Sequence, residues 1–113
     1  MKAISTGNAE HYKWGDDADG WHLLKSNDLS IIEESVPPGG TERRHYHTRS
    51  QQFFYVLTGI ASIEMAGETV QVHAGEGFHI PAGLPHQLMN NHTTDLRFLV
   101  VSQPQSHGDR VDA

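Results

Sequence analysis

Proline and glycine interrupt the middle of this chain at short intervals, and this feature most constrains how the chain can fold. Between residues 37 and 85 they stand at Pro37, Pro38, Gly39, Gly40, Gly59, Gly67, Gly75, Gly77, Pro81, Gly83 and Pro85. Both residues disfavour the interior of a helix, so long helices are not expected in this part of the chain. Most of the segments between them are rich in β-branched and aromatic residues, which is typical of strands.

Short strands are predicted at residues 29–36, 53–58, 60–65, 69–73, 77–80 and 96–101. The sequence Met-Ala-Gly-Glu at residues 65–68 is typical of a hairpin turn between two of them. Any helix should be confined to a short piece near residues 5–12. Many short strands joined by turns indicate an antiparallel sandwich or barrel, and 113 residues are the length of one domain. The sequence therefore predicts an all-β protein with a single domain.

Composition excludes several classes of function. The chain has no cysteine, which rules out a disulfide scaffold, a thiolate nucleophile and a cysteine-type zinc site. Its 8 Lys and Arg against 14 Asp and Glu give a net charge of −6, which argues against nucleic acid and anionic membranes as partners. The first residues carry no apolar leader, and the longest run of large apolar residues, 53–57, is too short to span a bilayer. We therefore expect a cytoplasmic protein.

Nine histidines are an unusually high count for a chain of this length. Two of them, His45 and His47, are two residues apart in a strand-like stretch, so their side chains leave the same face of a strand. Two imidazoles on one face can converge on one cation. Taken alone, the same spacing also fits two surface histidines near a turn.

The residues around these histidines follow a longer pattern. Gly39 is followed at fixed intervals by His45, His47, Gln52 and Gly59, and Gly75 is followed in the same way by Pro81, Gly83, His86 and Asn90. This pattern resembles the two motifs of the cupin superfamily, G-(x)5-H-x-H-(x)3–4-E-(x)6-G and G-(x)5-P-x-G-(x)2-H-(x)3-N. Every named position matches except Gln52, which stands where the family has Glu. The match covers residues 39–90, about half of the chain.

The resemblance implies a cupin double-stranded β-helix, a jelly-roll barrel of one domain, with a metal ion bound inside. Carried over by position, the metal ligands are His45, His47, Gln52 and His86, with neighbouring Gln51 as a rival for the third. The ion would be one divalent transition metal: Zn, Ni, Mn or Fe. The barrel core would occupy residues 31–102, after an N-terminal arm and first strands at 1–30. A polar C-terminal tail at 103–113 is expected to be frayed.

The glutamine bears on the chemistry, because an amide can ligate only through its neutral carbonyl oxygen. A divalent ion would then keep its full charge, act as a stronger Lewis acid and be harder to oxidise. Cupins with this ligand set resemble polyketide cyclases or enzymes that ketonise unsaturated uronates. We expect isomerisation, cyclisation or lyase chemistry on a small oxygen-rich molecule such as a sugar acid or a polyketide, anionic molecules included. The alternatives are an iron-dependent dioxygenase, a non-catalytic ligand-binding or sensory cupin, and a degenerate barrel without metal.

Two further residues are candidates for catalytic roles. Arg43 shares strand parity with His45, so it is expected to point inward and clamp an anionic group, unless it is an outward, solvated arginine. His79 would be a general acid or base if it faced the cavity, and a surface histidine otherwise. The expected partners are a small-molecule substrate and a second copy of the chain, since open sheet edges need covering.

Overall fold

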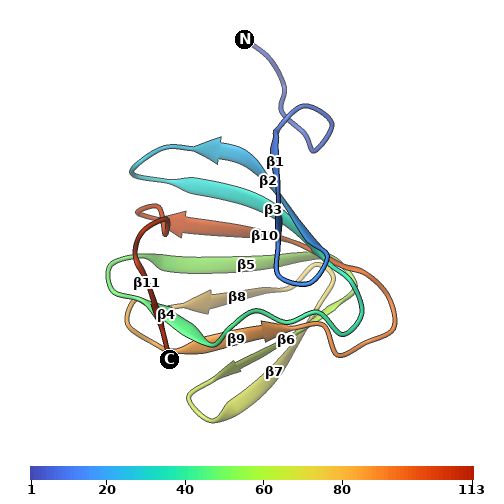
Figure 1. Cartoon of the computed structure of the whole chain (residues 1–113), viewed down its shortest axis with the longest axis vertical. Coiled ribbons are helices and arrows are strands. Elements are labelled where there is room, and N and C mark those ends of the chain that lie inside the picture. The colour runs from blue at the N-terminus through green and yellow to red at the C-terminus, as the bar shows by residue number, and fades with distance from the viewer.

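The computed structural model describes residues 1–113 and is built from eleven antiparallel strands, with no helix. The strands form two sheets that face each other (Figure 1). The six-stranded sheet has the order β1 (Glu10–Trp14), β2 (Ala18–Lys25), β3 (Ser30–Val36), β10 (Leu96–Gln103), β5 (Gln51–Thr58) and β8 (Gly77–Ile80). The five-stranded sheet has the order β11 (Arg110–Asp112), β4 (His45–His47), β9 (His86–Met89), β6 (Ile60–Met65) and β7 (Glu68–His73).

The sequence-based expectation of an all-β barrel in one domain is confirmed. The predicted hairpin joins β6 to β7, where Met65 pairs with Glu68. Its two central residues, Ala66 and Gly67, have φ of 55° and 79°, as the two-residue turn that suits strand twist requires. The structure contains no helix with the length and apolar character needed to cross a bilayer.

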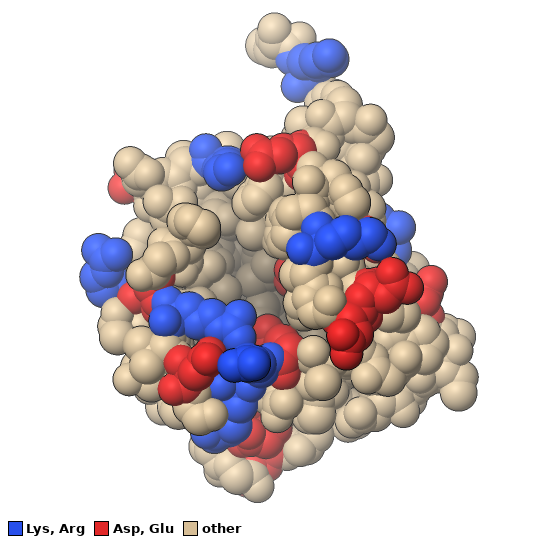
Figure 2. All heavy atoms as spheres, viewed as in Figure 1, with Lys and Arg blue, Asp and Glu red and all other residues tan.

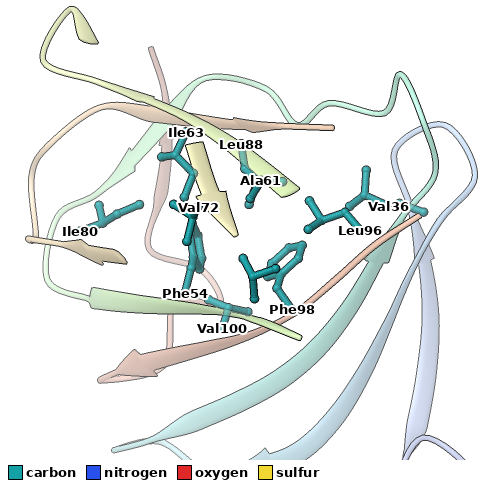
Figure 3. Close-up of a cluster of buried hydrophobic side chains, with 12 residues drawn as sticks. Val36, Phe54, Ala61, Ile63, Val72, Ile80, Leu88, Leu96, Phe98 and Val100 are labelled. Atoms are coloured by element: carbon teal, nitrogen blue, oxygen red, sulfur yellow. The ribbon is translucent and has the colours of Figure 1, made fainter. Parts of the chain in front are cut away.

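Strict alternation along β5 and β10 separates the interior of the barrel from its outer surface. Figure 3 shows the buried side chains that meet between the two sheets. Phe54 and Val56 of β5 are buried, and Phe98 and Val100 of β10 lie beside them. Such burial of apolar side chains is the main stabilising contribution to the fold.

Beyond the apolar core, the inward-facing side chains of β5 and β10 are polar. Phe54 pairs with Val100, and two residues further along Gln52 pairs with Ser102. Both polar residues are buried, with 7% and 1% of their surface exposed. The strands that build the core therefore also carry polar side chains into the barrel interior, where the candidate site lies.

One expectation about the chain ends is wrong. Residues 5–12, the one place where the sequence allows a short helix, contain a turn at 6–8 that leads into β1. The segment after residue 102 is not frayed, because residues 110–112 form β11, which pairs with β4. Asp109, just before β11, is 6% exposed. A polar three-residue strand carries no apolar alternation, so only its pairing partner, distant in sequence, reveals it.

Candidate metal centre

Three imidazoles from two neighbouring strands converge inside the barrel. His45 and His47 leave the same face of β4, and His45 pairs directly with His86 of β9. One ring nitrogen of each histidine lies within 4.8 Å of those of the other two. All three side chains are buried. The structure thus brings together the three histidines that the sequence pattern singled out.

Backbone carbonyls fix the orientation of each ring. Nδ1 of His45 donates to the carbonyl oxygen of Arg43 at 2.7 Å, and Nδ1 of His86 donates to that of Leu84 at 2.9 Å. Nδ1 of His47 makes the corresponding bond at 3.3 Å, to a residue of the C-terminal segment. A carbonyl only accepts, so Nδ1 carries the hydrogen and Nε2 keeps its lone pair. Nε2 of His47 and of His86 is buried without any hydrogen-bond partner.

Gln52 presents a second kind of unpartnered acceptor to the same cavity. Its Nε2 donates to Oγ of Ser102 at 3.0 Å, and its Oε1 is buried with no partner. The rival Gln51 points to the outer surface, where it bonds the side chains of Gln103 and His79. The structure therefore places Gln52, and not Gln51, in the interior with the histidines.

These residues fit a divalent transition metal. Buried polar atoms without a partner are costly, and among the four candidate ligands the unpartnered atoms are two imidazole nitrogens and an amide oxygen, which are metal-ligand types. Burial lowers the pKa of all three histidines, that of His45 to about 4. The rings are therefore neutral at pH 7, which is the form that binds a metal.

The histidines His45 and His47 open onto a cavity of about 560 Å³. Figure 2 shows this face of the molecule hollowed at its centre, with acidic and basic side chains around the rim. Apolar wall is supplied by Trp14, Ile32 and Phe54. The cavity also has polar lining residues from both sheets and from the C-terminal segment: Glu10, Tyr12, Lys25, Glu34, Glu42, Gln105, His107 and Arg110.

Asp109 fastens the C-terminal segment against the strand that carries two of the histidines. Its carboxylate accepts hydrogen bonds from the backbone N–H groups of Thr48, Arg49 and Ser50 and from the Thr48 hydroxyl. The Thr48 hydroxyl and these N–H groups hold the pKa of Asp109 well below its usual range. The backbone carbonyl oxygen of Asp109 accepts the hydrogen bond from Nδ1 of His47. No pattern in the sequence marked this residue.

The predicted inward orientation of Arg43 is wrong. Its side chain is 82% exposed and lies 3.5 Å from a carboxylate oxygen of Asp112 at the surface. The backbone from residue 42 to residue 44 is not a strand, and β4 begins only at His45. Parity counted back from His45 therefore does not hold at Arg43.

His79 also lies outside the cavity. It is exposed on β8, beside Phe53 of β5, and its Nε2 bonds Gln51 on the outer face. Its neighbour Ile80 is the residue of this strand that points into the core, with 2% of its surface exposed. The catalytic roles expected for Arg43 and His79 have no support from their placement.

Two carboxyl groups of the cavity wall were missed by the sequence analysis. Glu34 shares strand parity with Ile32 on β3, and this alternation was the signal that could have found it. Glu42 lies in the irregular segment before β4, and its Oε1 accepts the backbone N–H of Leu88 at 2.9 Å. Burial raises the pKa of Glu34 to about 7 and that of Glu42 to about 8.

Known proteins resemble this chain in sequence and in fold. Residues 32–102 match the family model of the Cupin domain. The protein SCO3923 of Streptomyces coelicolor is 30% identical over 104 residues, which cover 92% of this chain and 97% of that protein. KdgF from Halomonas sp. has a TM-score of 0.85 at 18% identity, over 95% of this chain and 98% of that chain. The polyketide cyclase RemF from Streptomyces resistomycificus has a TM-score of 0.82 at 24% identity, over 93% and 80%.

Proposed function

The chain belongs to the cupin family, and from this premise we propose that it is a metal-dependent enzyme for non-redox chemistry on a small, oxygen-rich molecule. One divalent ion (Zn, Ni, Mn or Fe) would be held by His45, His47, His86 and Gln52. The observation that carries the proposal is the set of buried, unpartnered acceptors, Nε2 of His47, Nε2 of His86 and Oε1 of Gln52. Three atoms of metal-ligand type without a partner are not expected of a barrel that only acts as a scaffold.

The glutamine favours isomerisation, cyclisation or lyase chemistry over oxidation. A bound divalent ion supplies Lewis acidity, which polarises a carbonyl or enol oxygen. Gln52 brings no negative charge to the site, and Ser102 holds its amide so that oxygen faces inward. Trp14, Ile32 and Phe54 give the cavity an apolar wall that excludes water from part of the bound molecule. The fold shared with a polyketide cyclase is consistent with this class of reaction.

Metal analysis tests the proposal directly. We expect protein purified without added metal to contain close to one divalent ion per chain. Zinc affinity, measured by competition with a chromophoric chelator, should fall roughly 10- to 100-fold in His47→Ala and in Gln52→Ala. His73→Ala is the matched control, because His73 is exposed on β7 and should leave the affinity unchanged. Equal metal content in all four proteins would refute the site, and iron together with oxygen uptake would favour a dioxygenase instead.

A further inference from the structure

Three residues on adjacent strands form one row across the cavity wall. Tyr12 of β1 pairs with Gly20 of β2, and Gly20 pairs with Glu34 of β3. The tyrosine ring lies over the glycine so closely that a Cβ on Gly20 would be 2.2 Å from Cζ of Tyr12. The Tyr12 hydroxyl thereby reaches across β2 and donates to Oε2 of Glu34 at 3.2 Å.

The carboxyl group of Glu34 has surroundings different from those of Glu33, its neighbour in the sequence. Glu33 faces the outer surface, where Arg97 pairs with it at 2.6 Å. Glu34 faces the cavity that it shares with His45, and its one hydrogen bond is the one from Tyr12. A half-buried carboxyl group with no cation partner is costly for a protein to keep charged.

Other titratable groups face the same cavity from each wall. They are Glu10 of β1, His22 and Lys25 of β2, Glu42 before β4, His45 and His47 of β4, and His107 and Arg110 of the C-terminal segment. Lys25 is paired with Glu10 at 3.3 Å, and Arg110 is paired with Asp112 at 3.4 Å. Burial raises the pKa of Glu34 to about 7, although the hydrogen bond from Tyr12 opposes this shift. A carboxyl group of this kind both takes up and releases a proton near neutral pH.

We propose that Glu34 is the proton-transfer group of the cavity, that Tyr12 positions it, and that the substrate is a neutral molecule bearing hydroxyl and carbonyl groups. This inference rests on the proposed function and names its acid–base residue. The cavity's carboxyl groups at Glu34 and Glu42 have no cation partner, whereas Lys25 and Arg110 already have carboxylates beside them. An anionic substrate would find no unpaired lysine or arginine among the side chains that line the cavity, and a neutral polyhydroxylated substrate needs none.

The step that Glu34 would perform is balanced without any further reactant. Its carboxylate takes the proton from a carbon next to the substrate carbonyl. The electron pair of that C–H bond forms a carbon–carbon double bond, and the carbonyl becomes an enolate. The first carbon carries a hydroxyl group. The neutral Glu34 then returns the proton to the former carbonyl carbon while the proton of that hydroxyl group passes to the enolate oxygen, so that the carbonyl group has moved by one carbon and substrate and product are isomers.

Hydrogen exchange into a simple hydroxyketone tests the inference. Zinc-loaded protein is incubated with dihydroxyacetone in D₂O, and loss of the C–H signal is followed by proton NMR. We expect exchange to fall at least roughly 100-fold in Glu34→Gln and to be unchanged in Glu33→Gln, the matched control on the outer face. Tyr12→Phe should raise the pH midpoint of exchange, since the Tyr12 hydrogen bond lowers the pKa of Glu34.

An infrared titration gives a readout that does not depend on turnover. The wild-type minus Glu34→Gln difference spectrum should contain a protonated carboxyl band that disappears with a midpoint near pH 7. No such band should distinguish wild type from Glu33→Gln. Absence of the band, absence of exchange in wild type, or equal exchange in Glu34→Gln would each overturn the inference. Zinc affinity, measured on every variant, separates this failure from that of the metal site, which would show as a wild type that does not bind zinc.

Discussion

At the scale of single residues, hydrogen bonds to the far side of each ring or amide select the atom that faces the cavity. Oγ of Ser102 accepts a hydrogen bond from the Gln52 amide, just as the carbonyl oxygen of Leu84 accepts one from Nδ1–H of His86. Each of these contacts leaves an acceptor turned inward. Outer contacts of this kind are known to set both ligand orientation and metal affinity.

Changing the charge at Gln52 should therefore change metal affinity. We expect Gln52→Glu to raise zinc affinity about 10-fold, because a carboxylate attracts the ion more strongly than an amide oxygen does. The Ser102 hydroxyl, which accepts a hydrogen bond from the Gln52 amide, can donate one to the carboxylate instead. Competition with a chelator measures the change. Gln51→Glu adds the same charge on the outer surface, and an equal gain there would contradict the explanation.

Gly20 is the residue on which the Tyr12 ring rests, so a methyl group there should be poorly tolerated. We expect Gly20→Ala to lower the free energy of unfolding by about 1–3 kcal/mol, because the ring has to move from its place. Urea denaturation measures this loss. In a Tyr12→Ala background the same substitution should cost much less, and full additivity of the two changes would argue against the contact.

At the scale of elements, the polar end of the chain is the part that completes the site. β11 pairs with β4 so that Arg110 stands opposite His47 and Asp112 opposite His45. The Asp109 carboxylate binds the three residues that follow β4. A segment with no apolar side chain in the core is therefore held by hydrogen bonds and surface ion pairs, and its stability is local.

Removing the Asp109 carboxylate should release this segment and weaken the metal site together. We expect Asp109→Ala to lower zinc affinity roughly 10- to 100-fold and to speed tryptic cleavage after Arg110. Chelator competition and timed proteolysis measure the two effects. Asp112→Ala, on the same strand, loses only surface ion pairs and should behave as wild type. Unchanged proteolysis in Asp109→Ala would disprove the fastening role.

Sequence reasoning succeeded where a pattern was long or strictly alternating. The core strands β5 and β10 follow from period-two burial, and the spacing of the two motifs singled out the histidines that the structure gathers. It failed at Arg43, because the backbone there is not yet a strand. It also missed Asp109, whose role depends on partners about sixty residues away. Contacts of this range leave no local signal in the sequence.

At the scale of the whole molecule, two sets of buried groups change the free energy of unfolding with pH in opposite directions. The buried histidines His45, His47 and His86 have lowered pKa values, so their contribution to the free energy of unfolding is complete above pH 6.5 and is lost as pH falls. Glu34 and Glu42 have raised pKa values, so their contribution is complete below pH 4.5 and is lost as pH rises through about 7 and about 8. Between pH 6.5 and pH 8, of these groups only the two carboxyl groups change the free energy of unfolding.

We therefore expect the metal-free protein to lose stability from pH 6.5 to pH 8, by on the order of 2 kcal/mol. Urea denaturation with a chelator present measures the profile. Glu42→Gln should flatten the decline, because the neutral amide keeps an acceptor for the Leu88 N–H and never becomes charged. Glu33→Gln should leave the decline as it is. A wild-type profile that is flat or rising over this range would contradict the assignment.

The outer face of β5 carries apolar side chains that a lone barrel leaves in water. Phe53, Tyr55 and Leu57 are 43%, 38% and 38% exposed, and such patches mark interaction surfaces. We propose a homodimer that buries this face. Light scattering should give twice the chain mass of 12.6 kDa, and Tyr55→Glu should give the monomer. Val70→Glu, at an apolar position equally exposed on β7, should remain dimeric.

The hydrogen bond between the His47 ring and Asp109 can form only late in the synthesis of the chain. The two residues are 62 positions apart, and a ribosome adding about 5–20 residues per second needs several seconds to pass from one to the other. During that interval the His47 ring lacks the hydrogen bond that fixes its orientation in the folded protein. We therefore expect the proposed ion to bind only after residue 109 has been added, so that a nascent fragment stalled before residue 109 should emerge without an ion.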